Sequence, residues 1–99
     1  MTNQKAASLR LIVKLCSDKS AFEVRTVKRF TLDMRKVKLA LGHNGLHEII
    51  VDTPHMMIAR IGKAEATISR DGRMLIKRVC DETEAKHVAN QILSAILRQ

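Results

Sequence analysis

The sequence predicts one α+β domain, in which an antiparallel sheet of about five to six strands carries two helices on one face. Length and composition fit this class, because 99 residues are the size of a single domain and 45% of them are hydrophobic. Short stretches of alternating apolar and polar residues occur in two groups, and a stretch of helical periodicity follows each group. We expect residues 1–7 to form a flexible tail and residues 8–99 to form the domain.

The first group of strands lies before residue 31. Apolar residues at every second position predict a half-buried strand over residues 9–16. Residues 17–20 read Ser-Asp-Lys-Ser, which is typical of a turn, and Phe22 and Val24 then alternate with charged neighbours in a second strand. The two strands together predict a hairpin.

A helix is predicted to follow this hairpin. Thr31 is the expected cap, and Asp33 falls in the first turn, where the helix dipole favours a negative charge. Apolar residues then recur at helical spacing at Met34, Val37 and Leu41. Gly42 is the expected residue just beyond the end of the helix.

Four more strands are predicted in the middle of the chain. They cover residues 46–52, 56–61, 65–69 and 74–79, and each is bounded by turn residues. The pair Asp71-Gly72 is a strong hairpin signal between the last two of them.

The last element has the clearest pattern. Residues 81–84 read Asp-Glu-Thr-Glu, a variant of the capping box that begins many helices. The apolar positions that follow recur on one helix face: Ala85, Val88, Ala89, Ile92, Leu93, Ile96 and Leu97. We expect this helix to lie on the sheet, because nothing else in so short a chain can cover its apolar face.

Alternation also assigns residues to the two faces of the sheet. The face covered by the helices is predicted to hold Leu9, Leu11, Val13, Leu15, Phe22, Val24, Ala66, Ile68, Met74 and Ile76. The opposite, open face is predicted to hold Arg10, Ile12, Lys14, Glu23, Arg25, Glu65, Thr67, Ser69, Leu75 and Lys77, with Arg73 where the last strand begins. The open face is therefore polar and inclined to positive charge.

The charge of the whole chain suggests a polyanionic partner. The formal net charge is +8 and the pI is about 10.1. The candidate nucleic-acid-binding residues on the open face are Arg10, Lys14, Arg25, Ser69, Arg73 and Lys77. A second basic cluster comprises Arg25, Lys28, Arg29, Arg35, Lys36 and Lys38. The alternative for both sets is an ordinary solvated surface, which is common on antiparallel sheets and on helices.

Several short matches resemble one repeat of the TATA-box-binding protein family. Residues 32–36 read Leu-Asp-Met-Arg-Lys, where that family opens a helix with Leu-Asp-Leu-Lys-Lys. Residues 59–61 match a strand that ends in hydrophobic-Arg-hydrophobic, and residues 72–74 match a Gly-basic-Met hairpin. An acidic cap and a long helix over residues 81–97 close the repeat. The resemblance spans residues 22–97, about four-fifths of the chain, and implies a curved sheet like half of the family's saddle.

The departures from that family concern its mode of binding. The family has two repeats, and its phenylalanines wedge between base steps of DNA. One of these positions corresponds to Ser69 here, and Pro54 stands near the other. The strand over residues 9–16 is an addition. Kinking of DNA by aromatic wedges is therefore not expected.

Two functions of different kinds agree with these observations. The first is non-enzymatic binding of a DNA or RNA backbone through the basic sheet face, because phosphate contacts need only cations and donors. The alternative is a protein-interaction module, or a subunit of a larger assembly, with an acidic protein partner. A homodimer is a further hypothesis, because a one-repeat chain could pair to rebuild a two-repeat saddle.

Catalysis, metals and cofactors receive no support from the residue pattern. The His residues and Cys80 lack the paired spacing of zinc ligands, and the glycines form no phosphate loop. Cys16 and Cys80 are expected to be reduced and buried, although a bridge between them is an alternative. Neither a membrane span nor a secretory signal is recognisable, so we expect a cytoplasmic protein.

Overall fold

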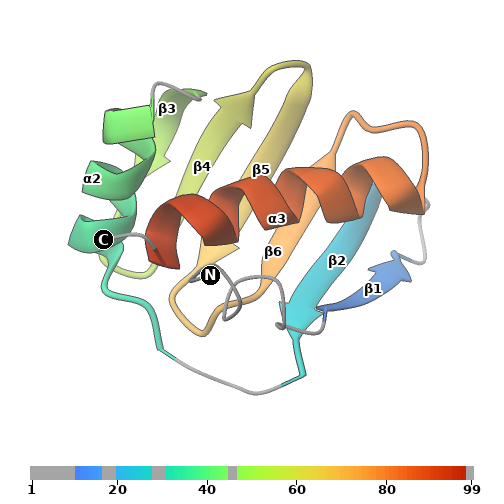
Figure 1. The fold of residues 1–99 in the computed structure, drawn as a ribbon, viewed down its shortest axis with the longest axis horizontal. Helices are drawn as coiled ribbons and strands as arrows, with labels where there is room; N and C mark the ends of the chain where they lie inside the picture. The colour runs from blue at the N-terminus through green and yellow to red at the C-terminus, as the bar shows by residue number, and fades with distance from the viewer. Residues whose placement is uncertain (1–10, 17–19, 28–30, 45–46, 98–99) are drawn as a thin grey trace, which may run out of the picture.

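The computed structural model describes residues 11–16, 20–27, 31–44 and 47–97, and the predicted tail over residues 1–7 lies outside them. The described residues form a six-stranded antiparallel sheet with two helices packed against it, which confirms the predicted fold class (Figure 1). No helix in this part of the chain is long and apolar enough to cross a membrane.

The sheet joins a hairpin to a four-stranded meander. Its strands are β1 (Leu11–Leu15), β2 (Ala21–Thr26), β3 (His47–Asp52), β4 (Met56–Ile61), β5 (Ala64–Ser69) and β6 (Met74–Lys77). Their order across the sheet is β1-β2-β6-β5-β4-β3. The strands from β3 to β6 follow one another along the chain, whereas β2 pairs with β6, the strand farthest from it in sequence. The first hairpin therefore joins the rest of the sheet only through β6, the last strand in the chain.

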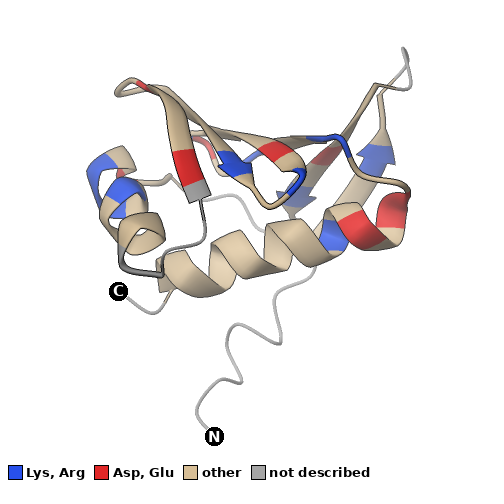
Figure 2. Ribbon diagram, turned by 90° about the horizontal axis from the view of Figure 1, so that it is seen from above, with Lys and Arg blue, Asp and Glu red and all other residues tan. Residues whose placement is uncertain are grey.

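The helices α2 (Met34–Asn44) and α3 (Glu82–Leu97) lie on one face of this sheet. Helix α3 crosses the sheet and contacts β1, β2 and β6, while α2 packs beside α3 near the β3 edge (Figure 1). The core between the layers is aliphatic, and its largest fully buried side chains are Leu41, Met57, Ile68, Met74, Ile76, Ile92, Val24 and Val37. The face turned away from the helices stays open (Figure 2).

The beginning and end of α2 differ from the prediction. Its cap is Asp33 and not Thr31, because the Asp33 carboxylate accepts a hydrogen bond from the Arg35 backbone N–H at 3.0 Å and the Asp33 carbonyl accepts one from Val37 at 3.0 Å. The helix also continues through Gly42 to Asn44. Gly42 is solvent-exposed, and a side chain there would meet no atom within 4 Å, so no close packing marks it as an end.

Helix α3 begins with the predicted cap in a modified form. The Asp81 carboxylate accepts a hydrogen bond from the Glu84 N–H at 2.9 Å. The Glu84 carboxylate reaches back to the N–H of Cys80 at 2.7 Å, one residue before the capping residue of an ordinary capping box. Strand β6 ends at Lys77 and not at Val79, because Arg78 takes a left-handed conformation with φ 62° that an extended strand cannot contain.

The predicted division of the sheet into two faces agrees with the structure, with one exception. Val24, Ala66, Ile68, Met74 and Ile76 are buried under the helices as predicted, and Leu11, Val13 and Phe22 are half-buried. Leu15 is 44% exposed, because it lies at the end of the edge strand β1. The remaining predicted position, Leu9, lies outside the described residues.

Candidate nucleic-acid interface

The open face of the sheet is arranged in rows that run across the strands. At the end nearest the β4–β5 turn, the register places Lys77, Glu65, Arg60 and Glu48 side by side on β6, β5, β4 and β3. We call these four residues the charged row. The next positions along the same strands are Leu75, Thr67, Ile58 and Val51, which we call the apolar row. Both rows occupy the β3–β6 half of the face.

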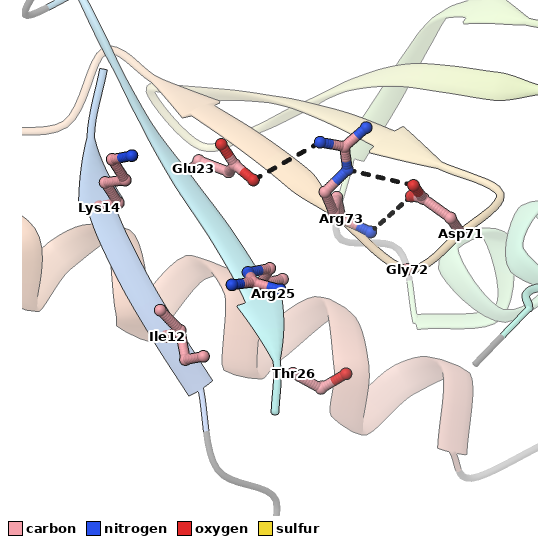
Figure 3. Close-up of a pocket in the computed structure, with 8 residues that line it drawn as sticks. All are labelled: Ile12, Lys14, Glu23, Arg25, Thr26, Asp71, Gly72 and Arg73. Carbon is pink, nitrogen blue, oxygen red and sulfur yellow. Dashed lines mark hydrogen bonds and ion pairs between the residues drawn. The ribbon is translucent and has the colours of Figure 1, made fainter. Parts of the chain in front are cut away.

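The other half of the open face carries a group of three cations. Lys14 on β1, Arg25 on β2 and Arg73 at the start of β6 surround a cavity of about 340 Å³ (Figure 3). We call these three residues the basic corner. Ile12, Glu23, Thr26, Asp71 and Gly72 complete the lining of the cavity. Arg25 directly follows Val24 and Arg73 directly precedes Met74, and Val24 and Met74 are register partners, so the two arginines stand on neighbouring strands.

Local turn geometry fixes the position of Arg73. The β5–β6 turn is closed by the Ser69 N–H, which donates to the Arg73 carbonyl at 2.8 Å, and by the Gly72 N–H, which donates to the Ser69 carbonyl at 3.0 Å. Gly72 adopts φ 93°, a conformation that a residue with a side chain rarely takes. This turn therefore delivers Arg73 to the rim of the cavity.

Two carboxylates hold the guanidinium of Arg73. Its Nε donates to Asp71 Oδ2 at 3.1 Å, and its Nη1 lies 3.7 Å from Glu23 Oε2 (Figure 3). The Arg73 backbone N–H also donates to Asp71 Oδ1 at 3.1 Å. This backbone hydrogen bond, together with the Arg73 charge, lowers the pKa of Asp71 below its usual value and outweighs the opposing effect of burial. The guanidinium is thus oriented before any ligand arrives.

Lys14 and Arg25 are held less tightly than Arg73. Both side chains are exposed, and neither forms an ion pair with another residue of the described chain. Their charges therefore remain available to an anion in the cavity, whereas the charge of Arg73 is partly compensated by its two carboxylates.

The six candidate residues from the sequence do not form one site. Lys14, Arg25 and Arg73 come together, and Ser69 lies beside them through its hydrogen bond to Arg73. Lys77 lies in the charged row, paired in register with Glu65, at the far end of β6. Arg10 lies outside the described residues.

Ion pairs on the open face are the main feature that sequence reasoning missed. Glu48 and Arg60 form an ion pair at 3.0 Å in the charged row, and neither was assigned to a face. The roles of Glu23 and Asp71 as partners of Arg73 also became apparent only from the structure. The alternation of Met56–Ile61 could have placed Arg60 on the open face, since Met57, Ala59 and Ile61 are the buried positions of that strand.

The second basic cluster is divided between the two faces of the molecule. Arg35, Lys36 and Lys38 are on α2, on the covered side, whereas Arg25 lines the cavity of the open face. Lys38 is occupied by an ion pair with Asp52 at 2.8 Å, which ties α2 to the end of β3. Lys28 and Arg29 lie outside the described residues.

Residues of metal-ligand types and two cysteines are the other reactive groups of the described residues. No group of three or more His, Cys, Asp or Glu side chains in them could hold a metal ion. Cys16 and Cys80 are both free thiols, and Cys80 is exposed, contrary to the expectation that it is buried. The neighbouring Glu84 carboxylate raises the pKa of Cys80, first by accepting a hydrogen bond from it and then by its charge, so this thiol is a weak nucleophile.

Comparison with known proteins assigns neither a family nor a function to the chain. No family model, no curated protein and no solved structure matches the chain. Function must therefore be argued from the chain's own residues.

Proposed function

We propose that this protein binds the phosphate backbone of DNA or RNA, without catalysis, through the basic corner of its open sheet face. The observation that carries the proposal is the convergence on one cavity of Lys14 from β1, Arg25 from β2 and Arg73 from the β5–β6 turn. Adjacent cations repel one another, and a bridging phosphate removes that repulsion, so this arrangement favours an anion. The net charge of +8 would draw a polyanion toward the molecule.

The composition of the face favours binding that does not depend on base sequence. Phe22 is on the helix-covered side of β2, so its ring is not available to stack on a base from the open face. Cations and hydrogen-bond donors contact phosphates, which are the same for every sequence. We therefore propose positioning by backbone contacts and not recognition of a base sequence.

The fold is part of the same proposal. A sheet with both helices on one face, in this element order, agrees with the resemblance to a single TATA-box-binding-protein-like repeat. In Figure 2 both helices lie on one side of the sheet, and the opposite face is left uncovered for a partner. Backbone binding by cations replaces the aromatic wedges that this chain lacks.

The salt dependence of binding tests the proposal. Fluorescence anisotropy would be used to titrate labelled duplex DNA, single-stranded DNA and RNA with the protein at several salt concentrations. If three cations neutralise three phosphates, the logarithm of the affinity should fall against the logarithm of salt with a slope of about −2.7 for a duplex and about −2 for a single strand. Binding that is undetectable at low salt would contradict the proposal.

A pair of charge-matched variants locates the site. The double change Lys14→Glu and Arg25→Glu should abolish binding, because it removes the two uncompensated cations of the basic corner. The control, Lys36→Glu with Lys86→Glu, changes the net charge equally but alters exposed residues on the helices. Equal loss of binding in both variants would show that net charge alone is responsible and would remove the assignment to this corner.

A further inference from the structure

The charged row changes sign at every strand. Its order is Lys77, Glu65, Arg60, Glu48, so positive and negative side chains alternate from the middle of the sheet to its β3 edge. Such a row does not favour a polyanion, because each cation has a carboxylate beside it.

When the order of this row is reversed, every position carries the opposite charge. Two copies of the row can therefore pair if they run in opposite directions. If a second copy faces the first across a two-fold axis parallel to the strands, between β5 and β4, the row meets itself in the opposite direction. Lys77 then faces Glu48 of the other copy, and Glu65 faces Arg60, so every contact pairs opposite charges. A two-fold axis along the row would instead place each charged residue opposite the same residue of the other copy. Like charges would then face one another, and their repulsion opposes this arrangement.

The apolar row obeys the same symmetry. The two-fold axis that pairs the charges places Leu75 over Val51 and Thr67 over Ile58. Leu75 is 37% exposed on the open face, and the other three residues of the row are half-buried. Aliphatic contact would supply affinity, while the neighbouring charges set the orientation.

We propose that the β3–β6 half of the open face is a homodimer interface, in which a second copy of this chain packs by the charged and apolar rows. The basic corner is on β1, β2 and the start of β6, mostly outside the overlapping strands, and the proposal does not depend on nucleic-acid binding. Four strands contribute on each side, which corresponds to a small interface and a dimer of roughly micromolar or weaker affinity.

Sedimentation equilibrium on nuclease-treated protein, from roughly 1 µM to 1 mM, measures this association directly. Arg60→Glu should raise the dimer dissociation constant about tenfold or more, because it places a glutamate against Glu65 of the other copy. Exchange of the two charges, Arg60→Glu with Glu65→Arg, restores opposite pairing and should recover most of the affinity. Thr67→Lys tests the apolar row, since it introduces a long cation next to the axis without altering the charged row.

Leu39 provides the control, because it is the most exposed large apolar side chain on the helices among the described residues, at 59%, and lies on α2. Leu39→Lys should leave the dimer unchanged. A chain that remains monomeric over the whole range overturns the proposal, as does dimerisation that survives Thr67→Lys or is lost in Leu39→Lys. A gain of mass only when nucleic acid is added also overturns it. Circular dichroism of each variant verifies that the fold is retained.

Discussion

At the scale of single residues, Arg78 is the one non-glycine residue with a positive φ in the part of the chain that the structure describes. It connects β6 to α3 and has φ 62°, in the left-handed region, where the Cβ atom of most residues meets the backbone. No such restriction applies to glycine. The chain therefore accepts local strain in order to turn from the sheet toward the cap of α3.

Relief of this strain is measurable. Arg78→Gly should raise the free energy of unfolding by roughly 0.5–1 kcal/mol, because the left-handed penalty exceeds the extra entropy that glycine gives the unfolded chain. Urea denaturation measures the change. Arg78→Ala retains a Cβ atom and should give no such gain, so equal stabilisation by both variants would point to the loss of the arginine side chain as the cause.

The thiol of Cys80 is the second residue with an unusual environment. Glu84 raises the pKa of Cys80 above the ordinary value of 9.0, so little thiolate is present near neutrality. Glu84→Gln should lower this pKa and increase the rate of alkylation by iodoacetamide at pH 8, by about tenfold for each pKa unit. Peptide mapping separates Cys80 from Cys16.

Glu82→Gln is the matched control for this experiment, because it removes a carboxylate from the same first turn of α3 without touching the Glu84 contact. Its alkylation rate should stay close to that of the unmodified sequence. If it accelerates alkylation as much as Glu84→Gln, the general charge of the helix terminus, and not the contact with Glu84, controls the thiol.

At the scale of elements, the start of α2 distinguishes two polar residues, Thr31 and Asp33, which are separated by Leu32. Asp33→Ala should lower the free energy of unfolding by about 1 kcal/mol, because it removes the acceptor for the Arg35 N–H. Thr31→Ala alters an exposed residue before the helix and should change stability by less than about 0.5 kcal/mol. Thermal or urea denaturation of the two variants decides between them, and the reverse ranking would restore Thr31 as the cap.

Elements defined by local patterns were predictable from the sequence. Met56–Ile61 has the bounds that its turn residues predict, and α3 begins one residue after its predicted capping segment opens. In the strand every second residue is buried, and in α3 the buried residues recur at helical spacing, as at Ala85, Val88, Ala89 and Ile92. Their pattern is a direct consequence of lying half in the core, which is why sequence alone reveals it.

The rows of the open face were not predictable, for two physical reasons. The first is β3, where a bulge between Ile49 and Val51 breaks the period of two within a run of apolar residues. The second is register between distant strands. Alternation places Lys14, Arg25 and Lys77 on the open face, but only the pairing of β2 with β6 shows that Arg25 lies beside Arg73, whereas Lys77 lies beside Ala21 at the other end of β2. The predicted set therefore included Lys77, which lies away from the basic corner, and it did not include the ion pairs of Arg73.

At the scale of the whole molecule, the two halves of the open face differ in the arrangement of their charges. The basic corner gathers three cations at a cavity, whereas the charged row neutralises itself strand by strand. A single net charge of +8 conceals this division. Binding of an anion by the basic corner and self-association through the charged row can consequently use different parts of one sheet.

The pairing of β2 with β6 also governs the order in which the sheet can assemble. The meander from His47 to Lys77 is linked by short connections, so its hairpins can close early and at low entropic cost. Strand β2 ends at Thr26 and can dock only on β6, the last strand of that meander, which begins at Met74. Long-range closure of this kind slows folding. The first hairpin in the chain should therefore be the last part of the sheet to gain protection from hydrogen exchange during refolding, and the basic corner, which spans this junction, forms only at that final step.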